Sequence, residues 1–177
     1  MIKWPKKDAR EKLEIEGFIN AYQRLPHGHR LEIISKRDKP DYIVRNKSLQ
    51  QEFGIELTSV YLDGKSVPNY HLKDDREWVS FMLDVAQISA YQERLANAVR
   101  LKIAKAKKDY DRSRPLLLSV FANEYVTIIF GKYEWQSLAS KFTDVFSDIL
   151  PFREIVFWPL ANDHVFSVPS FGVPVFA

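Results

Sequence analysis

The chain has 177 residues, of which 46% are apolar and 28% charged, with a formal net charge of +3. This composition is typical of a soluble globular domain, and no run approaches the roughly 20 apolar residues that a membrane-spanning helix needs. The absence of cysteine excludes disulfides and cysteine-ligated zinc, and the N-terminus lacks the apolar segment of a secretory signal. We therefore expect a cytoplasmic protein without a membrane partner.

Hydrophobic periodicity predicts a single α/β domain over residues 1–177. In chain order, the predicted elements are a helix at 8–25, strands at 30–35, 41–45 and 53–60, an irregular excursion at 61–76, a long helix at 78–110, a strand at 116–121, a helix at 133–149 and a strand at 153–158. Residues 125–130 fit either a further strand or the start of the next helix. The apolar tail at 164–177 fits either a last edge strand or a segment that packs on a partner. This order predicts an antiparallel meander followed by a crossover helix.

Two carboxylates fall on neighbouring predicted strands, Asp41 at the start of one and Glu56 within the next. A hairpin centred between Ser48 and Leu49 places them directly opposite each other, with Cβ atoms about 5 Å apart on one face. A slip of one residue would put them on opposite faces. Glu56 belongs to a face that meets other protein, where an unpaired carboxylate is costly. A divalent cation such as Mg²⁺ resolves the conflict. The alternative is that Asp41 caps a turn and Glu56 pairs with a Lys or Arg.

These residues, Pro40-Asp41 and then Glu56-Leu57-Thr58, resemble the motif of the PD-(D/E)XK nuclease superfamily. The element order over residues 9–121 is similar to its restriction-endonuclease-like core, a helix, a three-stranded antiparallel meander, a long helix and a strand. Residues 122–177 would then form an α/β C-terminal extension. The resemblance implies hydrolysis of phosphodiester bonds with Mg²⁺ or Mn²⁺ held by Asp41 and Glu56. It favours DNA as the substrate, in restriction, defence or repair.

Thr58 departs from this pattern, because the superfamily usually has a lysine there. Some members supply the lysine from the following helix. On the predicted long helix Lys102 lies about 60° from the centre of the apolar stripe, and Lys105 lies farther from it. Lys102 would stabilise developing negative charge, while Thr58 could orient a water molecule. The alternative for Lys102 is a solvated position beside a basic helix end.

The resemblance also points to secondary candidates. Gln87 and Tyr91 look like the QxxxY element of RecB-like members, although a core tyrosine beside a surface glutamine explains them equally. Glu14 lines up with the buried stripe of the first helix and could hold the metal directly or through water; Glu32 is an alternative. For Glu14 a carboxylate at the edge of the helix surface remains open.

The sequence leaves two functions open. The first is a metal-dependent nuclease. The second is a catalytically inactive member of the same fold that binds nucleic acid or protein, with the C-terminal apolar tail as a homodimer or partner surface. The position of Lys102 relative to the carboxylates discriminates between them.

Overall fold

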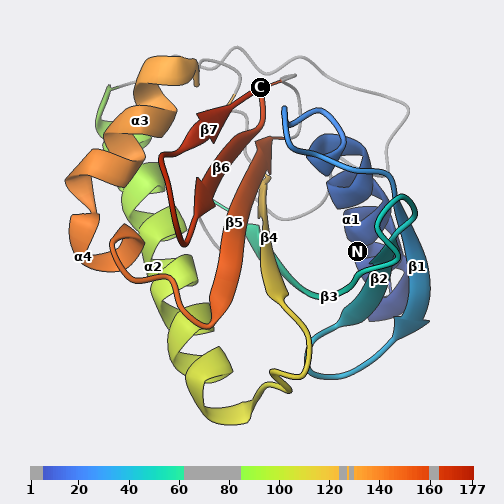
Figure 1. The fold of residues 1–177 in the computed structure, drawn as a ribbon. Coiled ribbons are helices and arrows are strands. Elements are labelled where there is room, and N and C mark those ends of the chain that lie inside the picture. Colours follow the sequence, from blue (N-terminus) through green and yellow to red (C-terminus); the bar gives the residue numbers. More distant parts are fainter. Residues whose placement is uncertain (1–5, 62–84, 124–126, 128–129, 160–163) are drawn as a thin grey trace.

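The computed structural model describes residues 6–61, 85–123, 127, 130–159 and 164–177. Within them the chain forms four helices and seven strands, in the α/β order that the sequence predicts (Figure 1). The elements in chain order are α1 (Lys7–Tyr22), β1 (Leu31–Lys36), β2 (Tyr42–Asn46), β3 (Glu52–Val60), α2 (Val85–Asp109), β4 (Leu116–Ala122), α3 (Lys132–Lys141), α4 (Thr143–Phe146), β5 (Phe152–Pro159), β6 (Phe166–Pro169) and β7 (Val175–Phe176).

All seven strands belong to one mixed sheet, and their spatial order is the same as their order in the chain. β1, β2 and β3 form the predicted antiparallel meander. β3, β4 and β5 are parallel, and β6 and β7 add antiparallel pairs at the far edge. Parallel neighbours require a crossover connection; α2 connects β3 to β4, and α3 with α4 connects β4 to β5. The residues after β4 therefore continue the same sheet.

Helices cover both faces of the sheet, α1 on one side and α2, α3 and α4 on the other (Figure 1). Strand β4 lies at the centre, with all seven of its residues buried. Its residues alternate between two apolar clusters: Leu117 and Phe121 pack under α1, whereas Leu118 and Val120 pack under α2 and α3. None of the helices that the structure describes is both long and apolar enough to cross a membrane.

The hairpin between β2 and β3 has the register that the sequence predicts. Tyr42 pairs with Ile55, and Arg45 pairs with Glu52. In the turn, the side-chain oxygen of Asn46 accepts hydrogen bonds from two backbone amides that follow it, and this capping is a known use of asparagine. Because Asp41 comes directly before Tyr42, the same register puts it opposite the residue after Ile55, which is Glu56.

Two predictions for the C-terminal third are decided by the backbone. The single helix predicted at 133–149 is wrong, because Phe142 leaves the helical region (φ −114°, ψ 48°) and separates α3 from α4. The amide of Phe142 closes the last turn of α3 on Leu138, and its carbonyl oxygen accepts from Val145 at the start of α4. The tail forms strands β6 and β7, with β7 at the edge of the sheet, which matches the edge-strand alternative of the prediction.

Three predicted segments lie wholly or partly outside the described residues. The long helix is described from Val85 onward, so its predicted start at 78 is not covered. Only Tyr61 of the predicted excursion at 61–76 is described. Of residues 125–130, only Thr127 and Phe130 are described, and both are buried.

We expect Gly17→Ala to destabilise the protein by about 1–2 kcal/mol. A Cβ atom on Gly17 would lie 2.6 Å from the Trp158 ring. That ring is stacked on Phe121 at a centroid distance of 4.0 Å, and its indole N–H donates to Ser119, so it cannot move freely. Overpacking of this kind costs about 1–3 kcal/mol, which exceeds the gain of about 1 kcal/mol from helix propensity. Urea unfolding measures the difference.

The control is Glu16→Ala, which changes the neighbouring exposed position of the same helix. We expect it to change the free energy of unfolding by less than about 0.5 kcal/mol. Equal stabilities of Gly17→Ala and wild type would show that the sheet yields to the added methyl group.

Candidate active site at the edge of strand β3

Strand β3 continues past the first residue of β2, Tyr42, which pairs with Ile55. This overhang, the part of β3 without a partner in β2, carries the candidate site. β2 pairs with β3 only as far as Ile55, whereas β4 accompanies β3 to Val60. Glu56 is the first residue of the overhang. It alternates with Ile55 and Leu57, which pack under α1, so its side chain points to the α2 face. Its exposed fraction is only 2%.

Asp41 directly precedes β2 and occupies the place that one more residue of that strand would take beside β3. Its Oδ2 accepts a hydrogen bond of 2.8 Å from the backbone amide of Leu57. The hydrogen-bond pattern of a strand directs the N–H and C=O of one residue to the same side. The Leu57 carbonyl oxygen therefore lies on this open side of β3 as well. Asp41 thus replaces a strand partner with a carboxylate, beside Glu56.

Lys102 on α2 completes the cluster from the next layer. Its Nζ donates to Glu56 Oε1 at 2.6 Å and to the Leu57 carbonyl oxygen at 3.0 Å. The Lys102 side chain is 23% exposed, so its stem lies along the protein while the ammonium reaches inward. Helical periodicity predicted that Lys102 reaches inward, and this prediction is confirmed. The bond to Glu56 also matches the alternative in which this carboxylate is paired with a lysine.

Burial makes the Asp41 carboxyl a weaker acid than usual. Its pKa is raised from 3.8 to about 6, first by burial and then by the negative charge of Glu56. The Leu57 amide and the Lys102 ammonium oppose this rise without cancelling it. Two carboxylates therefore share one ammonium, and the site retains affinity for a further proton or cation.

A second oxygen of Glu56 is left without a hydrogen bond. Among the described residues, neither Glu56 Oε2 nor the buried hydroxyl of Tyr110 has a partner at hydrogen-bonding geometry. The two groups nonetheless interact, because burial and then Glu56 raise the pKa of Tyr110. The Tyr110 ring is held edge-on against Phe152. A buried carboxylate oxygen without a well-formed hydrogen bond is a costly feature that a bound cation would relieve.

Glu14, Thr58 and the secondary candidate Lys105 border the same space from other sides. Glu14 on α1 accepts a hydrogen bond of 2.5 Å from the Ser59 hydroxyl, and burial raises the pKa of Glu14. Thr58 is half-buried between Leu57 and Ser59. Lys105, one turn after Lys102, contributes a second ammonium.

These groups line one cavity of about 350 Å³. The sequence predicted Asp41, Glu56, Lys102, Thr58, Glu14 and Lys105 among its lining residues. The other lining side chains that it did not predict are Lys7, Arg10, Glu11, Asp38, Ser59 and Tyr61. For Arg10 and Glu11 the signal was their spacing of four and three residues from Glu14 on one helix. Lys7 and Asp38 reach the cavity only through the fold.

The secondary candidates Gln87 and Tyr91 lie elsewhere, as does Glu32, the alternative to Glu14. Tyr91 is fully buried, and its hydroxyl donates to the carbonyl oxygen of Val60 at 2.7 Å. It precedes Lys102 by eleven residues, about 16 Å along the helix, and neither Tyr91 nor Gln87 lines the cavity. Their predicted role at the site is therefore not supported by their positions. Glu32 on β1 pairs instead with Arg45 on β2 and with Lys47 in the turn that follows β2.

The donor set suits a hard cation, although it is small. Within the described residues, no three His, Cys, Asp or Glu side chains are grouped so that they could hold a metal ion. Asp41 and Glu56 offer two carboxylates, and the Leu57 carbonyl oxygen shares the Lys102 ammonium with Glu56. Mg²⁺ commonly binds through one or two carboxylates and keeps several waters, so these residues fit it.

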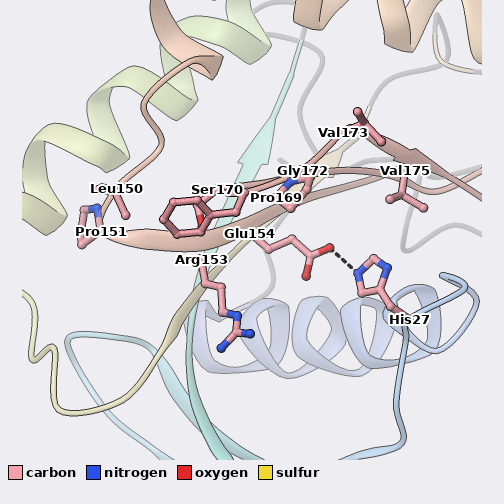
Figure 2. A pocket seen from close by; sticks show the side chains of 11 residues that line it. His27, Leu150, Pro151, Arg153, Glu154, Pro169, Ser170, Gly172, Val173 and Val175 are labelled. Atoms are coloured by element: carbon pink, nitrogen blue, oxygen red, sulfur yellow. Dashed lines mark hydrogen bonds and ion pairs between the residues drawn. The ribbon is translucent and has the colours of Figure 1, made fainter.

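A second cavity, of about 710 Å³, opens beside β5 on the α1 face (Figure 2). Glu154 is buried at one end, and its Oε1 accepts from His27 Nε2 at 2.6 Å and from the Ser167 hydroxyl. Both donors use the same oxygen, so serine and histidine are not arranged as a nucleophile and its base. The pair ties the loop after α1 to the sheet. Sequence reasoning did not find it, because 127 residues separate the partners.

Titration of Asp41 predicts a pH-dependent stability difference between wild type and Asp41→Asn. The carboxyl binds its proton more tightly in the folded protein, with a pKa of about 6, than in the unfolded chain, near 3.8. Its contribution to stability is therefore largest below about pH 4 and falls as the pH rises to about 6. The carboxamide oxygen of the variant can still accept from the Leu57 amide. We expect the melting temperature of the variant to rise relative to wild type across this window.

Asp148→Asn supplies a control of opposite sign. The Lys107 ammonium lowers the pKa of Asp148 from 3.8, so that carboxylate contributes stability that is lost only as the pH falls below about 4, and the difference between Asp148→Asn and wild type should stay constant from pH 4 to 7. Parallel melting curves for wild type and Asp41→Asn from pH 4 to 7 would contradict the assigned protonation of Asp41.

Removal of the His27 side chain is expected to destabilise the protein by about 1–3 kcal/mol, because the buried Glu154 carboxylate loses a donor. Urea unfolding of His27→Ala checks this. His29→Ala, at an exposed position of the same loop, is the control and should stay within about 0.5 kcal/mol of wild type.

Three elements that are distant in the sequence thus bring Asp41, Glu56 and Lys102 together at one edge of the sheet. The chain matches no protein-family model, no curated protein and no solved structure.

Proposed function

We propose that this protein is a metal-dependent nuclease of the PD-(D/E)XK type, with its active site at the edge of β3. The observation that carries the proposal is that Asp41 and Lys102 both bond the backbone of Leu57, while the same Lys102 ammonium also holds Glu56. Asp41 and Glu56 come from the hairpin and Lys102 from the crossover helix.

The architecture supports this interpretation. A helix, an antiparallel meander, a crossover helix and a parallel strand follow one another as α1, β1–β3, α2 and β4. The superfamily that the motif resembles has this order in its core. The order also explains how the site forms: α1 covers one face, α2 the other, and the hairpin leaves β3 open between them.

Asp41, Glu56 and the Leu57 carbonyl oxygen would hold the ion. When bound, Mg²⁺ or Mn²⁺ would polarise a phosphoryl oxygen and make a water molecule more acidic. Glu56 Oε2 makes no hydrogen bond of good geometry among the described residues, which leaves this carboxylate acceptor capacity for such a ligand.

Other residues of the chain would act on the substrate. The Lys102 ammonium would stabilise negative charge that develops on the phosphoryl group. Thr58 could orient a water molecule through its hydroxyl, but it cannot supply the positive charge that a lysine would bring there. Lys7, Arg10 and Lys105 border the cavity and would contact phosphates, which makes binding dependent on salt. DNA is the favoured substrate by resemblance.

One observation favours a second function, a non-catalytic module that binds nucleic acid. The Lys102 ammonium already satisfies Glu56 Oε1 and the Leu57 carbonyl oxygen. With Thr58 in place of the motif lysine, this ion pair would be the permanent structure of the site, and no metal ion would bind there. The protein would then use its basic side chains for binding alone.

Plasmid cleavage in Mg²⁺ or Mn²⁺ tests the nuclease proposal. We expect nicking or linearisation by wild type, and a loss of about 100-fold or more in Asp41→Asn, Glu56→Gln and Lys102→Met, because the first two remove a carboxylate that holds the ion and the third removes the charge that acts on the reacting phosphate. Removal of the divalent ion with EDTA should abolish cleavage. A single-stranded RNA substrate, assayed in parallel, distinguishes the class of nucleic acid.

Glu52→Gln is the matched control, since Glu52 lies on the same strand but outside the cavity, paired with Arg45 and Arg114. Its cleavage rate should stay within about threefold of wild type. Equal cleavage by wild type and Glu56→Gln would reject this site. Salt-dependent nucleic-acid binding with no cleavage in any ion would favour the non-catalytic module.

A further inference from the structure

We propose that Lys102 is a resident cation of the metal site, and that its ammonium and a divalent ion exchange places on the same oxygens. The proposal rests on the metal site of the proposed nuclease. It adds that Lys102 has two positions, one on Glu56 and Leu57 and one in the cavity. Metal binding would then release the ammonium toward the substrate.

The geometry leaves room for one cation at a time. Lys102 Nζ lies 2.6 Å from Glu56 Oε1 and 3.0 Å from the Leu57 carbonyl oxygen. A divalent ion held by these two atoms would stand about 2.0–2.6 Å from each of them. It would therefore occupy nearly the position of the ammonium. Two positive charges at that separation also repel each other strongly in a partly dry site.

Burial explains why the ammonium sits there when no ion is bound. Glu56 is 2% exposed and lies on the inner face of the sheet. A carboxylate in that environment needs a positive partner, and removal of one partner from a buried pair leaves an uncompensated charge. Lys102 supplies that partner. It reaches Glu56 from α2, across the gap between helix and sheet.

The side chain of Lys102 is also free to leave. It is 23% exposed, far more than its carboxylate partner, and it lines the cavity of about 350 Å³. Its flexible four-carbon stem allows the ammonium to turn into this space without a movement of the helix. Glu14 and Asp41 border the same space and would attract the displaced charge. A phosphate that enters the cavity would meet it there.

Titration with Mn²⁺, followed by electron paramagnetic resonance and calorimetry, tests the exchange without recourse to activity. Lys102→Met removes the competitor and keeps the apolar stem. We expect it to bind Mn²⁺ about tenfold more tightly than wild type or better, because the ion no longer displaces an ammonium. Circular dichroism establishes that the variant is folded.

Lys105→Met is the matched control. It removes one positive charge from the same cavity, but Lys105 makes no hydrogen bond to Glu56 or Leu57 in the structure. The loss of a screened charge should raise Mn²⁺ affinity by less than about threefold. The excess of Lys102→Met over Lys105→Met therefore measures direct competition.

Thermal unfolding gives a second readout that does not depend on the strength of wild-type binding. Without metal, Lys102→Met should melt below wild type, because Glu56 has lost its cation. Saturating Mn²⁺ should raise its melting temperature by more than it raises that of wild type. In the double variant Glu56→Gln, Lys102→Met this excess should disappear.

The outcomes separate the exchange from the metal site itself. If Mn²⁺ binding is lost in Glu56→Gln yet is equal or weaker in Lys102→Met than in Lys105→Met, the exchange is overturned and the metal site stands. If neither wild type nor Lys102→Met shows binding that depends on Glu56, the metal site and the exchange both fall. Tighter binding in Lys102→Met alone supports both.

Discussion

The buried carboxylate of Glu56, on strand β3, is the feature on which the arrangement of this edge of the sheet depends. Glu56 cannot reach bulk water, so the layers around it must supply positive charge and donors. Lys102 does this from α2, and the pKa of the neighbouring Asp41 is raised first by burial and then by the negative charge of Glu56, which the single ammonium does not cancel. The Leu57 backbone takes part through both its amide and its carbonyl oxygen. The local geometry follows from this shortage of cations.

Apolar packing elsewhere in the sheet confines this shortage of cations to one edge. The two hydrophobic clusters hold α1 and α2 firmly against opposite faces of the sheet. Polar groups gather where β2 stops and β3 continues, since there the backbone lacks one strand neighbour. The cavity is therefore a product of unequal strand lengths. Helices at fixed positions on either side direct Glu14 and Lys102 toward the gap from opposite faces.

The sequence predicted the parts of this site that depend on short-range periodicity. The symmetry of one hairpin placed Asp41 opposite Glu56, and helical spacing pointed Lys102 inward. The sequence could not predict contacts between residues that only the packing of helices on the sheet brings together. For example, Glu14 accepts a hydrogen bond from Ser59 and makes none with the carboxylate pair. The same spacing argument placed Tyr91 correctly in the core, but its distance along α2 separates it from the cavity. The break at Phe142 has no marker in a run whose apolar periodicity continues through it.

The strand order of the sheet has a consequence for synthesis of the chain. Because spatial order and chain order coincide, each strand joins the edge left by the one before it, and no strand has to insert between two that are already paired. The sheet can grow in one direction as the ribosome delivers the chain. Until β5 arrives, however, the apolar β4 is an open edge of the kind that associates with other chains. The stretch between those two strands is therefore the interval of translation in which a chaperone would matter most.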